Sequence, residues 1–431
     1  MNEINKTAMI DDLVELLRIR SVTGSNLGRM RCHETIRRMA TRFGFAVTSH
    51  ASNQVLVVSP KGLKGQAKLG IIVHSDTVPV VEKEWHYDPY GEICSGRVYG
   101  RGVIDDKMGI ITALYAMMEL QEEIEHSWQI IIGSREEGEW TDMEEYLSET
   151  PVIPAFSITV DGDGIQHGCR GTINVMLKFP DKGGSESSVK SIKSDNHAWN
   201  VTPSGITVTL EDGTLVEVHS KSMHSAIATD RKENAIYKMM CALREVFQKQ
   251  FPGFVRFMDR YAETEGAEAI GIETIPEFFK EKGFLDSSIC PTLCQLEGGA
   301  LRIGINFRVS VEISKDDVTK ALSTICKELG CTYEIFEATY ASYVLPESEE
   351  IRMMLESYKK VLGKETKSTF APGTGYNAVF PNCAIFGPRF DPDHDEEDLC
   401  HQADESRTIE DICTFEEMLE DFVRNYLKIN H

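Results

Sequence analysis

Hydrophobic positions in the first part of the chain follow a helical pattern in some stretches and a strand-like pattern in others. Ile10, Leu13, Leu16 and Leu17 recur with the helical period, and a second helical stretch covers roughly 108–119. Short apolar runs of strand length lie at 55–58, 69–73, 130–132 and 157–160. Strands that are apolar on both faces and alternate with helices predict an α/β layer structure. Ligands of such sheets gather at the carboxyl ends of the strands.

The pattern changes after Gly171. Apolar and polar residues alternate at 173–179 and 301–308, as they do in half-exposed strands, and helical patterns lie at 232–248 and 315–329. The stretch 183–196 is rich in Ser, Lys and Gly, which predicts a surface loop. These features are typical of a separate α+β unit.

Helical patterns at 351–362 and 409–429 close the chain and complete the first domain. We therefore predict a discontinuous first domain, 1–171 and 342–431, that carries an inserted domain at 172–341.

Composition excludes several classes of protein. The 431 residues contain 45 Lys plus Arg against 68 Asp plus Glu, a formal net charge of −23. That excess of negative charge argues against nucleic acid and anionic membranes as partners, because neutralising phosphates needs clustered cations. No apolar run is long enough to span a bilayer, and the N-terminus lacks the pattern of an export signal.

Cysteine usage predicts a reducing compartment. The 11 cysteines are an odd number and form no C-x-x-C pair. Free, mostly buried thiols are the usual state in the cytoplasm, which is where we expect the protein. Nothing in the sequence marks any of them as catalytic.

Residues with metal-binding chemistry directly follow apolar runs. The run 69–73 leads into His74-Ser75-Asp76, and residues i and i+2 of an extended chain point to the same side. Asp76 could therefore hold the ring nitrogen of His74 that does not bind a metal. Asp161 ends another such run. A plain loop histidine is the alternative reading of this motif.

Two acidic pairs and a late histidine add to this pattern. Asp105 and Asp106 follow a Gly-rich turn, where they could simply cap the next helix. Glu136 and Glu137 point in different directions from one backbone, so one could bind a metal while the other handles a proton; a solvated acidic loop is the alternative. His401 lies near the end of the chain. Each cluster is ambiguous alone, but three of them directly after apolar strands would be an unusual coincidence.

In order and context these motifs resemble the cocatalytic-zinc peptidases, the family of carnosinase, aminoacylase, carboxypeptidase G and succinyl-diaminopimelate desuccinylase, and most of all the bacterial PepV-type dipeptidases. The similar segments are His74-Ser75-Asp76-Thr77-Val78-Pro79, Gly100-Arg101-Gly102-Val103-Ile104-Asp105-Asp106-Lys107, Glu136-Glu137-Gly138, Asp161 and His401-Gln402-Ala403-Asp404-Glu405. The resemblance implies a mixed-sheet α/β/α metallopeptidase catalytic domain with an inserted α+β lid domain.

The resemblance also implies a ligand set for two divalent metal ions. One metal would be held by His74 and Asp161 and the other by Glu137 and His401, with Asp105 bridging them. Three protein groups per metal leave room for a shared water, as a catalytic site requires. Zinc is the expected metal, although imidazole and carboxylate ligands also suit manganese and cobalt.

Further roles carried over from the family concern the reaction and the substrate. Glu136 would be the general base, with Asp76 supporting His74. His224 would donate to the tetrahedral oxyanion, and Asn200 and Arg308 would contact the substrate. Without the resemblance, His224 would be read as a surface residue and Arg308 as an edge-strand arginine.

A late Gly-rich loop resembles the segment that cradles the substrate's carboxylate through its backbone N–H groups. The loop contains Gly373, Thr374 and Gly375. Two departures from the family pattern leave the substrate's identity open: Pro372 removes one donor, and Met108 replaces a glycine after the Asp-Asp-Lys motif.

Asp163 is a candidate for binding the substrate's amino group. It lies two residues after Asp161, so both side chains would face the same side if the backbone stays extended. A spare carboxylate there could pair with the ammonium group of a dipeptide. The alternative is that Gly162 and Gly164 form a turn and Asp163 faces water.

We therefore expect a two-metal dipeptidase that cleaves short peptides with a free amino end. The alternatives are an N-acyl amino acid amidohydrolase on the same scaffold and a non-catalytic binding relative, which would have broken ligand positions. No G-x-S-x-G, P-loop or G-x-G-x-x-G motif points to another enzyme class. The expected partner is a small peptide substrate, with no nucleic acid or membrane, and the chain would be a monomer or a homodimer.

Overall fold

The computed structural model describes residues 3–63, 65–123, 127–150, 152–183, 188–228, 230–389 and 399–429. The chain forms two compact units, which are described separately. Unit 1 comprises Met1–Gly168, Ser342–Thr369 and Gly375–His431, and unit 2 comprises Cys169–Ala341 and Phe370–Thr374. The sequence predicts junctions at 171/172 and 341/342, and the units of the structure divide at 168/169 and 341/342. The short return of the chain into unit 2 at 370–374 was not predicted.

A large mixed sheet forms the centre of unit 1. Its strand order is β1 (Ala46–His50), β2 (Val55–Ser59), β6 (Trp128–Gly133), β3 (Leu69–His74), β7 (Phe156–Thr159), β18 (Cys383–Phe386), β8 (Ile165–Cys169) and β16 (Ser342–Tyr343), and β17 (Thr369–Ala371) pairs with β8. Strand β3 is parallel to β6 and β7, and β18 is parallel to β7. The carboxyl ends of these four strands therefore share one edge of the sheet.

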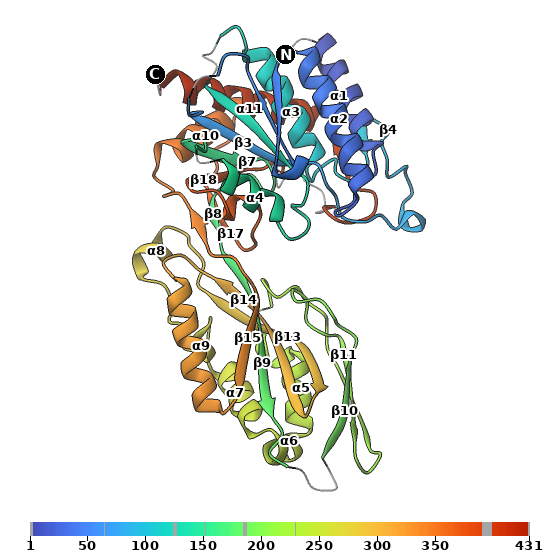
Figure 1. Ribbon diagram of the computed structural model, residues 1–431, viewed down its shortest axis with the longest axis vertical. Coiled ribbons are helices and arrows are strands. Elements are labelled where there is room, and N and C mark those ends of the chain that lie inside the picture. The colour runs from blue at the N-terminus through green and yellow to red at the C-terminus, as the bar shows by residue number, and fades with distance from the viewer. Residues whose placement is uncertain are drawn as a thin grey trace. The chain divides into compact units, whose positions relative to one another are not determined.

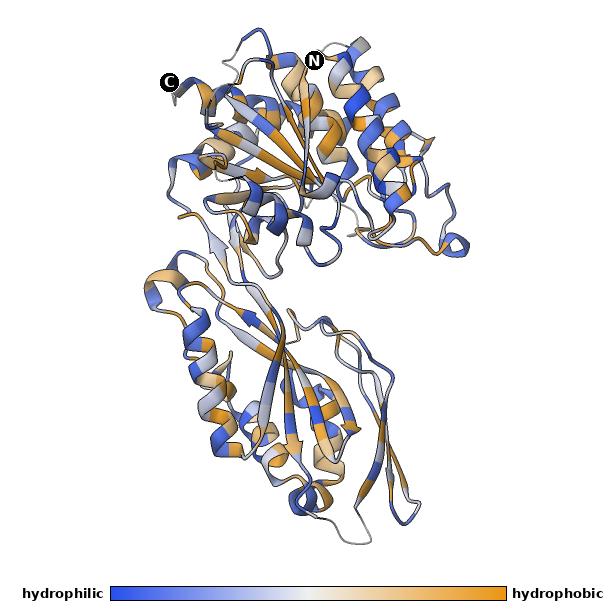
Figure 2. Cartoon of the chain, in the orientation of Figure 1, coloured by the Kyte–Doolittle hydropathy of each residue, from blue (hydrophilic) through white to orange (hydrophobic). Residues whose placement is uncertain are grey.

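Helices cover both faces of this sheet (Figure 1). The larger core contains residues of α1 (Glu3–Leu17), α2 (Asn26–Arg42), α3 (Lys107–Leu120), α10 (Glu349–Leu362) and α11 (Ile409–Ile429), and α4 (Thr141–Glu149) contributes to a smaller core. Leu56 and Val58 of β2 belong to the larger core, whereas Val55 and Val57 belong to the smaller one. This alternation follows from the period of two in a strand, and it explains why the runs are apolar throughout (Figure 2).

A small sheet joins two segments that lie far apart in the sequence. It consists of β4 (Glu92–Cys94), β5 (Arg97–Tyr99) and β19 (Ser406–Thr408), with β5 in the middle. The pairing of Ser406 with Tyr99 places the loop after β5 beside the loop before β19. Those two loops carry Asp105 and His401.

Unit 2 is built on an antiparallel sheet with the order β13 (Ser288–Glu297), β14 (Ala300–Val309), β9 (Gly171–Pro180) and β15 (Thr332–Ala338). Its core also takes in residues of α5 (Ala235–Ala242), α6 (Arg244–Gln250), α7 (Pro252–Glu263) and α9 (Lys315–Leu329). A smaller sheet is formed by β10 (Val189–Ser194), β11 (Gly205–Leu210) and β12 (Leu215–His219), and α8 (Glu277–Glu281) is a short helix.

The mixed α/β fold is the one that the sequence predicts, but several elements differ, including the following three. The predicted loop 183–196 contains strand β10, whose apolar residues Val189 and Ile192 are too few to give a strand signal. The predicted helix 232–248 is divided into α5 and α6 at Leu243, which has a non-helical backbone. Helix α2 was not predicted. None of the helices within the described ranges is long and apolar enough to cross a membrane.

Candidate active site

Three candidate ligands follow neighbouring parallel strands of unit 1. His74 is the last residue of β3, Glu137 lies in the turn after β6, and Asp161 follows β7. Because β3 pairs in parallel with both β6 and β7, the three side chains gather at one edge of the sheet. The order of the apolar strands thus determines where the polar residues meet.

Asp105 lies between two histidines. Its Oδ1 is 2.7 Å from Nε2 of His74, and its Oδ2 is 3.0 Å from Nε2 of His401. Nε2 of His401 also lies 2.9 Å from Oε1 of Glu137, and Nε2 of His74 lies 3.9 Å from Oδ2 of Asp161. One buried carboxylate therefore connects two groups of ligand atoms through its two oxygens.

The spacing of these atoms fits metal ions. Two ligands of one zinc ion, with bonds of about 2.0–2.2 Å at angles near 90–110°, lie about 3–3.5 Å apart. The donor atoms around Asp105 are separated by similar distances. Potential ligand atoms form two groups, and within each group they all lie within 4.8 Å of one another. One group is Asp105, Cys400 and His401, and the other is His74, Glu136 and Asp161.

The charge of the site fits metal ions as well. Burial, with the nearby charge of Asp105, raises the pKa of Asp161 to about 7. Burial, with the charge of Asp161, raises the pKa of Glu136 well above its usual value. Burial also acts on Asp105, but hydrogen bonds with His401 and His74 outweigh it and hold its pKa well below the usual value. Divalent cations would offset the repulsion within this carboxylate cluster.

Asp76 fixes both the imidazole of His74 and the turn that carries the two glutamates. The Nδ1 atom of His74 is 3.0 Å from the carbonyl oxygen of Asp76 and 3.4 Å from its Oδ1. The Asp76 carboxylate accepts hydrogen bonds from the backbone N–H groups of Glu136 (3.1 Å) and Glu137 (3.2 Å), and from the Thr23 hydroxyl (2.7 Å). Nε2 of His74 is thereby directed toward Asp105.

Tyr376 holds the same turn from another direction. Its hydroxyl donates to Oδ2 of Asp142 at 2.7 Å and accepts from the backbone N–H of Arg135 at 3.1 Å. A Cβ atom on Gly133 would lie 2.4 Å from this hydroxyl oxygen, so only glycine fits there. The indole N–H of Trp140 donates to the carbonyl oxygen of Glu136 at 2.6 Å.

A buried ion pair connects the loops that carry Asp105 and His401. Glu405 accepts hydrogen bonds from Arg101 (2.6 Å) and from the backbone N–H groups of Gly102 (3.1 Å) and Ile104 (2.8 Å). Both side chains of the pair are buried. This contact gives a physical reason for the final glutamate of the His401–Glu405 motif.

Glu136 and Gly375 lie against each other. A Cβ atom on Gly375 would be 3.0 Å from Oε1 of Glu136 and 3.7 Å from Oδ2 of Asp161. Asp106 accepts a hydrogen bond from the backbone N–H of His74 at 3.1 Å, and the peptide bond between Asp105 and Asp106 is cis. A side chain at position 375 would therefore cover the Glu136 carboxylate, and glycine leaves that space open.

Arg308 is a buried cation in unit 2. It is 6% exposed, and its Nε donates to Oδ1 of Asn306 at 2.9 Å while Nη1 donates to Oγ1 of Thr172 at 2.7 Å. The same Thr172 oxygen lies 3.5 Å from Oγ1 of Thr374. Within the described ranges no carboxylate forms an ion pair with Arg308. The structure thus joins Arg308 to Thr374 through one threonine.

His224 and Asn200 lie on exposed segments of unit 2 that are tied to the same network. The backbone N–H of Ser225 donates to the carbonyl oxygen of Asn200 at 2.8 Å, and the Ser225 hydroxyl donates to Oδ1 of Asn306 at 2.7 Å. Burial and the nearby charge of Arg308 lower the pKa of His224. Gly373 belongs to unit 2 as well, whereas Gly375 belongs to unit 1.

Asp163 has a partner within its own unit. Its Oδ1 lies 2.6 Å from Nε of Arg389, and its side chain is 64% exposed. The extended backbone assumed for 161–163 ends at Gly162, which has a φ of 125°. Binding of a substrate amino group by Asp163 stays a prediction.

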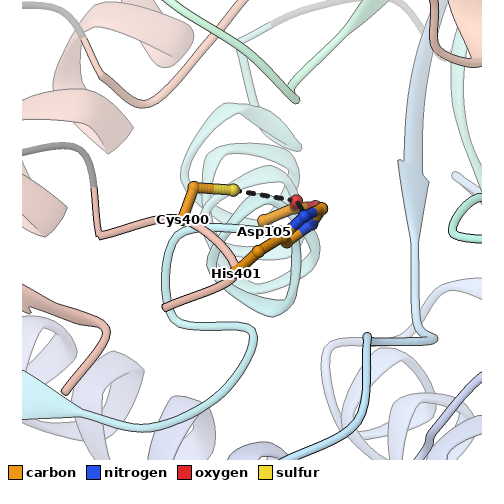
Figure 3. Close-up of side chains that lie close together, drawn as sticks. All are labelled: Asp105, Cys400 and His401. Atoms are coloured by element: carbon orange, nitrogen blue, oxygen red, sulfur yellow. Dashed lines mark hydrogen bonds and ion pairs between the residues drawn. The ribbon is translucent and has the colours of Figure 1, made fainter. Parts of the chain in front are cut away.

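Several residues of the site carry no signal in the sequence. Tyr376 meets Asp142 across 234 positions, and no spacing rule connects them. The thiol of Cys400, 3.2 Å from Oδ2 of Asp105, is another such residue (Figure 3). The only hint in the sequence is that Asp142 is an acidic residue shortly after Glu136-Glu137, which could have suggested that it supports the turn.

The family model for Peptidase family M20/M25/M40 matches residues 70–425. The chain belongs to this family. Membership confirms the resemblance seen in the five motifs and the prediction of a metal-dependent peptidase fold. The matched range runs from β3 to α11 and so includes every candidate metal ligand of unit 1.

Relatives in the M20 family match most of the chain. A Beta-Ala-Xaa dipeptidase of Lactobacillus delbrueckii subsp. lactis is 25% identical over 81% of this chain and 79% of its own. A putative dipeptidase of Staphylococcus saprophyticus is 23% identical over 92% of both chains. The solved structure of an aminoacylhistidine dipeptidase from Vibrio alginolyticus has a TM-score of 0.64 at 14% identity, covering 97% of this chain and 96% of its own. That structure supports the fold.

Proposed function

We propose that this M20 protein hydrolyses the peptide bond of dipeptides or short peptides with a free amino end, using two divalent metal ions. The observation that carries the proposal is the position of Asp105 between His74 and His401, with Glu137 beside one histidine and Asp161 beside the other. The relatives that are named as dipeptidases support the choice of substrate.

We assign His74 and Asp161 to one metal, Glu137 and His401 to the other, and Asp105 to both. When bound, the two metals would acidify a shared water and polarise the scissile carbonyl. The hydrogen bonds to Asp76 fix the His74 ring, so that Nε2 is the ligand atom. The donor set suits zinc, and zinc is the metal that we propose.

We assign the role of general base to Glu136. Its carboxylate is next to Asp161, and glycine at 375 leaves space beside Oε1. It would take a proton from water and pass it to the leaving amine. The two adjacent glutamates would have different roles. Glu137 lies beside His401 and would bind the metal, which leaves Glu136 to transfer the proton.

Unit 2 would supply positive charge and hydrogen-bond donors to the substrate. We assign the substrate's carboxylate to Arg308 and to the backbone of Gly373, Thr374 and Gly375. Arg308 has no carboxylate partner among the described residues, so an anionic group would compensate its buried charge. His224 would donate to the oxyanion, and Asn200 would contact the substrate beside it.

A substrate panel tests the proposal. Purified protein loaded with zinc is incubated with free dipeptides and with the N-acetyl forms of the same dipeptides, and the released amino acids are quantified. We expect a higher kcat/KM for the free dipeptides. A preference for the acylated forms would overturn the dipeptidase assignment in favour of an amidohydrolase. If neither form is hydrolysed, the proposal that the protein is an enzyme of this kind is wrong.

A further inference from the structure

A cysteine that none of the five motifs assigns to the metals points into the candidate metal site. The Sγ atom of Cys400 lies 3.2 Å from Oδ2 of Asp105. The same oxygen lies 3.0 Å from Nε2 of His401. Figure 3 shows the thiol and the imidazole approaching the Asp105 carboxylate together. Potential ligand atoms of these three residues all lie within 4.8 Å of one another.

The local backbone brings two adjacent side chains to the same carboxylate. Neighbouring residues of an extended chain point to opposite sides, which would send Cys400 and His401 apart. His401 instead has a φ of 62°, in the left-handed region that is uncommon for a residue other than glycine. The loop is held in place by the buried pair of Glu405 with Arg101.

We propose that Cys400 is a further ligand of the metal ion held by Asp105, Glu137 and His401. This inference rests on the proposed two-metal function. Zinc–sulfur bonds of about 2.3 Å and zinc–oxygen bonds of about 2.0–2.2 Å place the two ligand atoms about 3.1–3.6 Å apart at angles of 90–110°. The observed Sγ to Oδ2 distance of 3.2 Å lies in this range.

Metal binding by this thiol changes no oxidation state. The bond from hydrogen to sulfur breaks, the proton leaves to solvent, and the sulfur's electron pair forms the bond to the metal. A coordinated thiol is deprotonated by the metal's charge. Four protein ligands would then surround this ion, and a shared water would be its fifth ligand, a coordination number that catalytic zinc can reach.

A thiolate ligand would change the metal preference of one site only. Soft sulfur ligands favour zinc, whereas carboxylate and water ligands suit manganese. We therefore expect Cys400→Ser to weaken zinc binding by at least about tenfold, the lower end of the loss seen even for residues outside the ligand set. Manganese binding should change much less, because serine offers oxygen in place of sulfur.

Cobalt provides a direct test, because a Co²⁺–thiolate bond gives a charge-transfer absorption in the near ultraviolet. The metal-free protein is titrated with Co²⁺, and bound cobalt and absorption are recorded together. Cys94→Ser is the matched control, since Cys94 is a half-exposed thiol of the same unit whose Sγ faces Ser95 at 3.7 Å. Circular dichroism checks that each variant is folded.

We expect the band in the wild type and in Cys94→Ser, and its loss in Cys400→Ser. Two bound cobalt ions without the band in the wild type would overturn the assignment of Cys400 and leave the two-metal function intact. A band that persists in Cys400→Ser would also overturn it. A wild-type protein that binds no cobalt would contradict the proposed function itself.

Discussion

The candidate site residues of unit 1 and unit 2 differ in charge and in how firmly hydrogen bonds hold them. In unit 1 the residues are acidic or imidazole groups, and hydrogen bonds accepted by Asp76 and Glu405 and donated by Tyr376 fix the segments that carry them. In unit 2, His224 and Asn200 are exposed, and the buried candidate, Arg308, is a cation. The negative charges of unit 1 suit metal ions, and the buried cation Arg308 of unit 2 suits an anionic group of a substrate.

The difference separates two requirements of the proposed reaction. Metal ligands must keep a fixed geometry in the absence of substrate, and buried hydrogen-bond networks provide it. Substrate contacts need only be completed when the substrate binds. Variants of unit 1 should therefore alter metal content or turnover, whereas variants of unit 2 should alter kcat/KM with the metals retained.

Removing Asp105 should have the largest effect. Asp105→Ala eliminates the one carboxylate among the described residues that contacts both histidines, so we expect both metals to be lost and activity to fall below detection. Metal content of the dialysed variant and activity with added zinc are the measurements. A variant with the wild-type metal content would show that Asp105 is not a shared ligand.

Replacing Glu136 should abolish turnover and leave metal content unchanged. Glu136→Gln keeps the shape of the side chain and removes the basic oxygen, so kcat should fall by about 10²–10⁴-fold. Zinc content and kcat are measured on the same preparation. Retention of more than about a tenth of wild-type kcat would exclude the role of general base, and loss of zinc would make Glu136 a ligand.

Removing the buried cation of unit 2 should lower kcat/KM with both metals bound. Hydrogen bonds to charged groups contribute about 1.5–3 kcal/mol, so Arg308→Ala should lose roughly 10–150-fold in kcat/KM. Arg302→Ala is the matched control, because Arg302 lies on the same strand and pairs with Glu297. Equal losses in both variants would place the effect in the fold of unit 2 and not in substrate binding.

The smallest effect is expected for the hydroxyl that holds the glutamate turn. Tyr376→Phe removes the hydroxyl that donates to Asp142 and accepts from the backbone N–H of Arg135; we expect a loss of about 1 kcal/mol, so kcat should fall about fivefold without loss of metal. Tyr115→Phe removes a similar bond, 2.8 Å long, to Asp12 between α1 and α3. Thermal denaturation should show similar destabilisation for both, and only Tyr376→Phe should lower kcat.

Regular elements could be predicted from the sequence because their signal is local. The amphipathic period of residues 315–329 gave the helix with the bounds that α9 has, and the apolar runs gave β2, β3, β6 and β7 within a residue or two. Helix α2 was not predicted because its five arginines make it polar overall, although Cys32, Ile36, Met39 and Ala40 form a buried stripe at helical spacing. Strand β10 escaped because Ser and Lys dominate it.

The candidate ligands could be proposed from the sequence because a family resemblance supplied what spacing alone left ambiguous. Their supporting residues could not, since hydrogen bonds such as Tyr376 to Asp142 and Glu405 to Arg101 connect segments hundreds of positions apart. Cys400 stands directly before the His401 motif, but nothing in the sequence gives the direction of its side chain, which depends on the left-handed backbone of His401. For Asp163 the sequence suggested an extended backbone that would direct it to the same side as Asp161. The backbone turns at Gly162 instead, and Asp163 pairs with Arg389.

Metal stoichiometry measured together with activity tests the central claim most directly. The protein is stripped with a chelator and titrated with zinc, and bound metal and hydrolysis of a free dipeptide are followed at each step. The structure predicts about two zinc ions per chain at full activity and no activity in the stripped protein. Full activity with no metal bound, or no metal bound at saturating zinc, would contradict the two-metal site.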